Sequence, residues 1–170
     1  MKKLGLILTM VITGFLSNGA FAQGTVVDVA VGNKDFSTLV AALKAADLVT
    51  ALQGDGPFTV FAPTNSAFAK IDSKTLNSLL EPANQKALAN ILTYHVVSGK
   101  LAATDVVAAL KAGNGLVELK ALNGQVLTVT QKDGKIWLKD TNGNYSEIVV
   151  TDVMGSNGVI HVIDSVVMPK

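Results

Sequence analysis

The side chains best suited to acid–base or metal chemistry in this sequence are two histidines, His95 and His161. A zinc site needs three or four ligands, so two histidines would require carboxylates such as Asp164 or Asp152 beside them. Cysteine is absent, which excludes thiolate ligands, a cysteine nucleophile and disulfides. Because no phosphate-binding glycine loop or EF-hand run occurs either, we expect no metal or cofactor and interpret both histidines as hydrogen-bonded core residues.

A serine hydrolase is the enzyme that a set of serine, histidine and aspartate would support. The segment Gly155-Ser156-Asn157-Gly158 differs from the Gly-x-Ser-x-Gly elbow and lies in a turn between predicted strands. On a strand, His161 and Asp164 would point to opposite faces, which opposes a hydrogen bond between them. We therefore expect no catalytic residues and no enzyme, with a hydrolase that uses His161 or His95 as the alternative.

The N-terminus has the three regions of a secretory signal peptide. Lys2 and Lys3 are followed by an apolar run over residues 4–15 and by the small-residue site Ala20-Phe21-Ala22. The run is shorter than the ~20 residues that cross a bilayer, which disfavours a membrane anchor. We expect cleavage after Ala22 and export to the medium, the cell surface or the periplasm, without stable membrane insertion.

The mature chain, residues 23–170, is predicted to be one domain. Its 12 lysines and 13 acidic residues give a net charge of −1, and arginine is absent from the whole sequence. Nucleic-acid binding normally uses a basic face and the guanidinium fork of arginine. The charge therefore excludes nucleic acid as an expected partner.

The first half of this domain is predicted to be mostly helical. Apolar residues recur at three- and four-residue spacing from residue 35 until the glycines at 54 and 56, which predicts an amphipathic helix. A buried strand is expected over residues 58–62, between two prolines. Four further helices are expected. The first covers residues 66–71, and the second begins at an Asp72 or Ser73 cap and ends at Leu80. The third extends from Pro82 to Ser98, and the fourth begins at a Thr104 or Asp105 cap and ends at Lys111.

The helix that begins at Pro82 carries the most informative side chains of this half. The apolar stripe of Leu88, Ile91 and Leu92 continues to His95, which should face inward near the helix end. Tyr94 lies ~100° away, towards the edge of that face. Two interpretations of Tyr94 remain open: a contact residue on a binding surface, or a packing residue with a bonded hydroxyl.

The second half is predicted to be antiparallel β structure, which makes the fold α+β. Asn-Gly and Asp-Gly pairs, which favour hairpin turns, separate strand-like runs over 116–122, 125–131, 135–140, 147–152 and 159–167. The last run is apolar on both faces, as expected of a central strand. Trp137 alternates with two lysines, which predicts a surface aromatic that could stack on a sugar or protein partner or pack across an edge hairpin.

Three segments in this order resemble the fasciclin (FAS1) domain family. Gly56 to Phe68 (GPFTVFAPTNSAF) is similar to the first signature box of that family, and Asn157 to Pro169 (NGVIHVIDSVVMP) is similar to the second. Between them, Leu92 to Val97 (LTYHVV) is similar to the tyrosine-histidine motif. The resemblance covers the chain from about Val26 to Met168. It implies a wedge of two packed β-sheets with a cluster of helices on one side, and it implies that the two boxes are neighbours in the core.

The resemblance also implies a function. Family members are extracellular adhesion and matrix modules, and in some animal members the tyrosine-histidine motif and an Asp-Ile-Met stretch are implicated in integrin binding. Tyr94 and His95 match the first motif, and Asp152, Val153 and Met154 match the second with Val for Ile. The Glu-Pro that precedes this Asp in those members is replaced here by Val150-Thr151.

We therefore expect an exported, non-catalytic adhesion module that binds a cell-surface or matrix protein or glycan. Its candidate binding residues are Tyr94, His95, Asp152, Val153 and Met154. A structural matrix or envelope protein without a discrete ligand is the alternative.

Overall fold

The computed structural model describes residues 24–170, so the predicted signal peptide, residues 1–22, lies outside the described residues. The predicted α+β class is confirmed. The helices are α1 (Val26–Val31), η1 (Lys34–Phe36), α2 (Ser37–Ala45), α3 (Val49–Leu52), α4 (Asn65–Ala69), α5 (Ser73–Leu80), η2 (Pro82–Asn84), α6 (Gln85–Tyr94) and α7 (Ala103–Ala112). The strands are β1 (Phe58–Pro63), β2 (Val96–Ser98), β3 (Leu116–Lys120), β4 (Val126–Lys132), β5 (Lys135–Lys139), β6 (Tyr145–Gly155) and β7 (Gly158–Ile163). No helix within residues 24–170 has the length and apolar character to cross a membrane.

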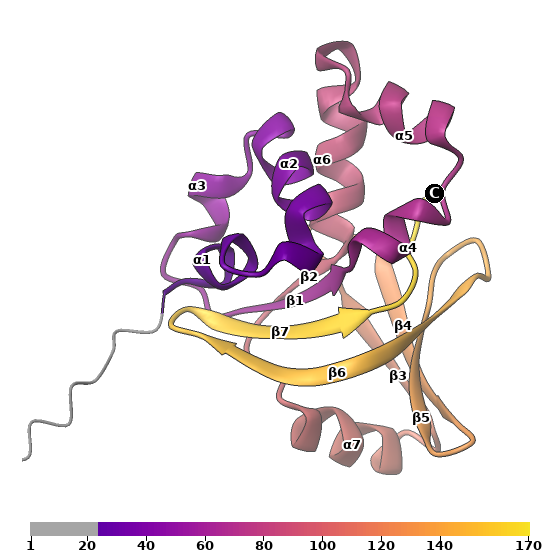
Figure 1. The fold of residues 1–170 in the computed structure, drawn as a ribbon. Helices are drawn as coiled ribbons and strands as arrows, with labels where there is room; N and C mark the ends of the chain where they lie inside the picture. The colour runs from indigo at the N-terminus through magenta and orange to yellow at the C-terminus, as the bar shows by residue number, and fades with distance from the viewer. Residues whose placement is uncertain (1–23) are drawn as a thin grey trace, which may run out of the picture.

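The strands form one mixed sheet that curls into a nearly closed barrel, in the order β2-β1-β7-β6-β5-β4-β3 (Figure 1). The long strand β6 is shared between a half that contains β1, β2 and β7 and a half that contains β3, β4 and β5, which is the expected wedge of two sheets. A single bridge between Val97 and Ala121 joins the two edge strands. The sheet is not wholly antiparallel, because β1 and β7 run parallel.

The two signature segments lie side by side at the centre of the sheet, as expected. All six residues of β1 pair with β7 in register, from Phe58 opposite Gly158 to Pro63 opposite Ile163. A Cβ atom on Gly158 would collide with the backbone of Phe58, so the close approach of the strands requires glycine there.

The central strands separate two apolar cores. Alternate residues of β1 and β7, such as Val60 and Ile160, pack with the N-terminal helices in the first core. Phe61 and Ile163 point the other way, into a second core inside the barrel. Side chains alternate across a strand, so burial on both faces explains why these runs are apolar throughout.

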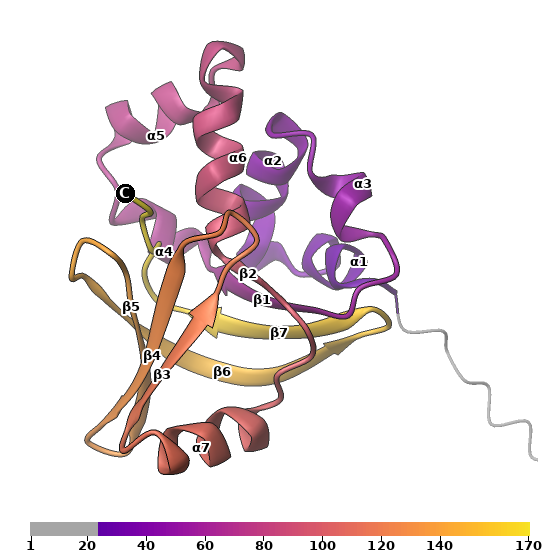
Figure 2. The ribbon, with the colours of Figure 1, turned by 180° about the vertical axis from the view of Figure 1, so that it is seen from behind.

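Helices α1 to α6 cover one side of the sheet, whereas α7 lies at the opposite end of the barrel (Figure 2). Helix α7 therefore lies outside the single helical cluster that was expected. It follows β2, a three-residue strand that the sequence does not reveal. Thr64 caps α4, and Asp72 caps α5 as predicted. Helix α7 instead begins after Ala102, whose N–H donates to the Asp105 carboxylate at 3.0 Å.

Candidate functional site

Tyr94 is a core residue at the end of α6. Its side chain has no exposed area and packs in the second core. The hydroxyl donates to the Val126 carbonyl at 2.9 Å, which ties the helical side to β4. Burial raises the pKa of the Tyr94 hydroxyl above its ordinary value, so this group stays a donor at neutral pH.

His95 is buried beside Tyr94 and faces inward, as the apolar stripe predicts. Its Nδ1 lies 2.8 Å from the Ile91 carbonyl, which can only accept, so Nδ1 donates. Its Nε2 accepts from the Val167 N–H at 3.2 Å and so holds the segment that follows β7. Burial lowers the pKa of His95 to about 4, against a smaller opposite effect of the Ile91 hydrogen bond. The imidazole is therefore a neutral structural link at neutral pH.

Asp152 occupies an irregular part of β6. The pairing of β6 with β7 shifts register between Ile148 and Val150 and again between Val150 and Val153. Asp152 has a φ of 58°, which aspartate tolerates better than most residues. Its Oδ1 accepts from the Ala103 N–H at 2.8 Å, so it satisfies a free N–H in the first turn of α7.

This irregular segment, residues 149–154, is called the β6 bulge below. Val149 and Val150 are 50% and 49% exposed, so two successive apolar side chains lie at the surface. Asp152 is exposed as well, whereas Val153 and Met154 are partly buried. The β6 bulge therefore presents a small apolar surface next to an acidic side chain.

The five candidate binding residues thus divide into two groups. Tyr94 and His95 lie inside the molecule, so the structure gives Tyr94 the packing role rather than a place at the edge of the surface. Asp152 is at the surface, with Val153 and Met154 partly so. A binding role for any of the five stays a prediction, and direct contact with a partner would require the buried pair to leave the core.

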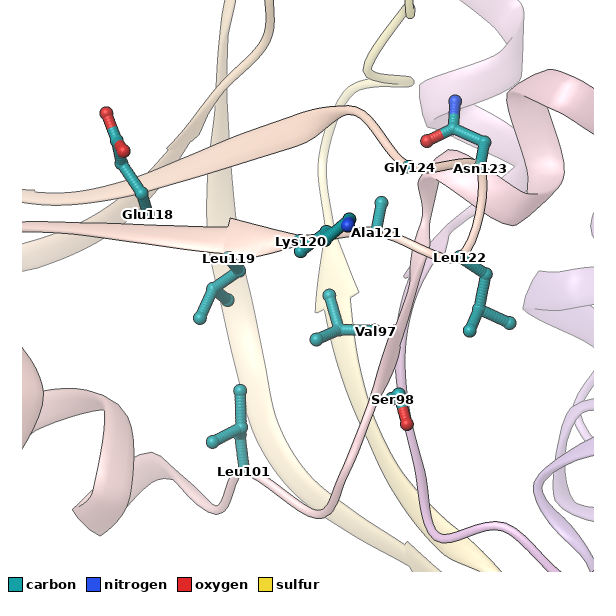
Figure 3. Close-up of a pocket in the computed structure, with 10 residues that line it drawn as sticks. All are labelled: Val97, Ser98, Leu101, Glu118, Leu119, Lys120, Ala121, Leu122, Asn123 and Gly124. Atoms are coloured by element: carbon teal, nitrogen blue, oxygen red, sulfur yellow. The ribbon is translucent and has the colours of Figure 1, made fainter.

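A second surface feature is the opening between the edge strands. Residues of β2 and β3 line a recess of about 720 Å³ beside the Val97–Ala121 bridge. Figure 3 shows Val97, Leu101 and Leu119 pointing into this gap. Val97 remains buried at this opening, whereas Leu101 and Leu119, which pack against the second core, are partly exposed.

Trp137 lies on the outer face of β5, as its alternation with lysines predicts, but it is only partly exposed. It lines a recess of about 390 Å³ with Thr130, Lys132 and Tyr145. Its indole Nε1 is buried and has no hydrogen-bond acceptor among the described residues. Trp137 is therefore part of a concave aromatic surface that is separate from the β6 bulge.

The family model of the fasciclin domain matches residues 34–169. This chain belongs to the fasciclin domain family. The match includes both central strands and the tyrosine-histidine pair, so the resemblance read from three short segments holds for nearly the whole described chain.

Relatives of this fasciclin domain occur in bacteria and in animals. Protein sll1483 of Synechocystis is 52% identical over 145 residues, which are 85% of this chain and 73% of that protein. Immunogenic protein MPT70 of Mycobacterium tuberculosis is 35% identical over 162 residues, 92% of this chain and 75% of that protein. Transforming growth factor-beta-induced protein ig-h3 of Sus scrofa is 40% identical over 147 residues, and the match covers 86% of this chain but only 20% of that larger protein.

A solved structure shows the same fold. The FAS1 domain pair from the insect cell adhesion molecule fasciclin I superposes with a TM-score of 0.74 over 84% of this chain and 50% of that chain. The sequence identity is 21%, so this likeness concerns the fold.

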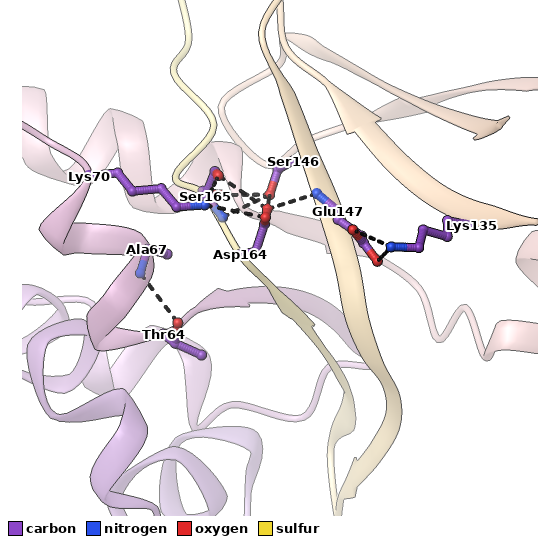
Figure 4. A network of polar contacts seen from close by, with 8 residues as sticks. All are labelled: Thr64, Ala67, Lys70, Lys135, Ser146, Glu147, Asp164 and Ser165. Carbon is purple, nitrogen blue, oxygen red and sulfur yellow. Dashed lines mark hydrogen bonds and ion pairs between the residues drawn. The ribbon is translucent and has the colours of Figure 1, made fainter. Parts of the chain in front are cut away.

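Fasciclin domains are non-catalytic adhesion modules, and Asp164 and His161 of this one have structural partners. Asp164 accepts from the Glu147 N–H at 2.9 Å and pairs with Lys70 at 3.3 Å (Figure 4). Burial alone would raise the pKa of Asp164, but hydrogen bonds from Glu147, Lys70 and Ser165 hold that pKa below its usual value. His161 bonds elsewhere, to the Leu101 carbonyl at 2.7 Å, so the hydrolase hypothesis loses its histidine–aspartate pair.

The sequence reasoning missed the roles of two asparagines, Asn157, which is buried, and Asn65, which is partly buried. Asn157 accepts from the Val26 N–H at 2.9 Å and donates to the carbonyls of Leu52 and Gly54, both at 2.8 Å. Asn65 accepts from the Thr38 N–H at 2.9 Å and so caps α2 from a distant segment. Both asparagines belong to the signature segments, which could have pointed to their importance. Their hydrogen-bond partners are too far away in the sequence to be inferred from it.

Proposed function

We propose that this fasciclin domain is an exported, non-catalytic adhesion module whose β6 bulge contacts a cell-surface or matrix partner, a protein or a glycan. The observation that carries the proposal is the exposed pair Val149 and Val150 beside Asp152. Apolar side chains on a surface favour binding because their burial in a complex releases water. The acidic neighbour adds a polar group that can set the orientation of the partner.

Asp152 has a second role in this proposal. Its carboxylate anchors the bulge to the start of α7, so the apolar pair is presented by a fixed backbone. A rigid contact surface loses less conformational entropy on binding than a flexible loop does. Tyr94 and His95 support the same surface indirectly, because they hold the barrel together.

The test is retention of beads coated with the full mature chain on cell-surface and matrix preparations under flow. We expect the double variant Val149→Ser/Val150→Ser to lose most of the retention while keeping its thermal unfolding midpoint. Val31→Ser removes another exposed valine, 57% exposed on α1, and serves as the matched control that should keep full retention.

Equal retention of the wild-type chain and the double variant would refute the β6 bulge as the contact surface. Retention no higher than that of uncoated beads would refute the adhesion proposal as a whole and favour a structural protein without a discrete ligand.

A further inference from the structure

We propose a second binding site, on the outer face of β4, β5 and β6, which takes an acidic polysaccharide, a chain of sugars that carry carboxylate groups. The site is the recess walled by Trp137 and Tyr145, and is called the aromatic recess below. It is separate from the β6 bulge, so the proposal does not depend on the proposed function.

The sheet register places the two aromatic rings for stacking. Trp137 lies opposite Glu147 and Lys139 lies opposite Tyr145, so the two aromatics are diagonal neighbours on adjacent strands. Diagonal neighbours on one face are ~7–8 Å apart, within the reach of aromatic side chains, and both rings line the same recess. The recess of about 390 Å³ is within the usual range of small-molecule sites, ~300–1,000 Å³.

Aromatic side chains of this kind suit sugars better than peptides. The faces of a sugar ring present C–H groups that pack on an aromatic ring, while its hydroxyls require polar neighbours. The indole Nε1 of Trp137 has no hydrogen-bond acceptor among residues 24–170, which is unusual for a buried donor. A small rotation of the ring towards a bound hydroxyl would supply that acceptor.

The charges around the aromatic recess identify the sugar class. Lys132, Lys135 and Lys139 all lie on this face. Side chains alternate between the two faces along β4 and β5, and these lysines take the positions that do not point into the core. Lys135 pairs with Glu147 at 2.9 Å, but the ion pairs among the described residues include neither Lys132 nor Lys139. The Lys139 ammonium lies 5.7 Å from the centre of the Tyr145 ring. Lys132 and Lys139, which have no ion-pair partner in the described part of the chain, lie beside two aromatics and complement carboxylate-bearing sugars.

The test uses Trp137 as its own reporter, because it is the only tryptophan of the chain. The mature protein is titrated with polygalacturonate, a uronic-acid polymer, and with dextran, a neutral polymer, while tryptophan emission is recorded. We expect a saturable change with polygalacturonate that weakens as salt is added, and no change with dextran.

Two double variants sharpen the result. Lys132→Ala/Lys139→Ala should raise the Kd about tenfold, equivalent to ~1.4 kcal/mol. Lys74→Ala/Lys86→Ala removes two exposed lysines from α5 and α6 and should leave the Kd unchanged. Absence of a saturable response, an equal response to dextran, or equal weakening in both double variants would each overturn the proposal.

Discussion

The tyrosine-histidine pair and the β6 bulge carry the two sets of candidate binding residues, and the fold treats them in opposite ways. Tyr94 and His95 are 0% and 2% exposed and make hydrogen bonds to β4 and to the segment after β7. The β6 bulge lies at the surface, with Val149 and Val150 half exposed. A motif that marks a binding family can therefore stabilise the scaffold, while the proposed contact surface lies in another part of the fold.

The largest expected effect is on the scaffold side of this comparison. Tyr94→Ala removes a fully buried ring from the second core and leaves the Val126 carbonyl without its donor. We expect a loss of ~4 kcal/mol in the free energy of unfolding, measured by urea denaturation. Tyr94→Phe, the control that keeps the ring, should lose only ~1 kcal/mol. Nearly equal losses in the two variants would show that the ring is not packed as described.

The pH dependence of stability should come next in size. The unfolded state binds a proton at His95 near pH 6.5, whereas the folded state does so only near pH 4. Stability contributed by the neutral imidazole is therefore full above pH 6.5 and is lost as the pH falls towards 4, by up to ~3 kcal/mol.

This loss is measured as the difference in unfolding free energy between pH 7 and pH 4.5. His95→Gln keeps a donor and an acceptor but does not titrate, so its stability should fall less over the same interval. Parallel pH profiles for the wild type and the variant would contradict the assigned role of His95.

Asp152 anchors the β6 bulge to α7 and should show an intermediate effect. Asp152→Ala deletes the acceptor for the Ala103 N–H and places alanine at a φ of 58°. We expect a loss of ~1–2 kcal/mol by thermal or urea unfolding. Asp152→Asn keeps an acceptor and tolerates this φ, so it should lose less than half as much. A harmless Asp152→Ala would mean that the bulge is not anchored to α7.

The smallest effect on stability is expected at the contact surface itself. Val149→Ser/Val150→Ser changes only side chains that are half exposed, so the unfolding free energy should change by less than ~0.5 kcal/mol per substitution. A differential scanning calorimetry measurement checks this. A loss as large as that of Tyr94→Ala would place these valines in the core and remove the contrast between the two regions.

Much of the fold could be predicted because its signals are local. Asn123-Gly124 and Asp133-Gly134 turn where the sequence indicates, and His95 faces inward as the helical stripe requires. The parallel pairing of β1 with β7 could not be derived from periodicity, since the strands are about a hundred residues apart. It entered only through the family resemblance.

The burial of Tyr94 could not be read from the helix alone. A residue ~100° from the apolar stripe is expected at its edge when one surface covers the helix. Here the end of α6 touches both cores: Leu92 packs in the first and Tyr94 in the second. Most of the second core comes from residues outside α6, such as Leu127 and Leu138 of strands that follow later in the chain, so no pattern within the helix reveals it.

The central claim, that Tyr94 is part of the scaffold and not of the contact surface, has a direct test in the reactivity of the two tyrosines. Tyr145 is 53% exposed, whereas Tyr94 has no exposed area. Mild nitration of the native protein followed by mass spectrometry should modify Tyr145 and leave Tyr94 intact until the chain is unfolded in urea. Nitration of Tyr94 in the native protein at a rate similar to that of Tyr145 would contradict the account.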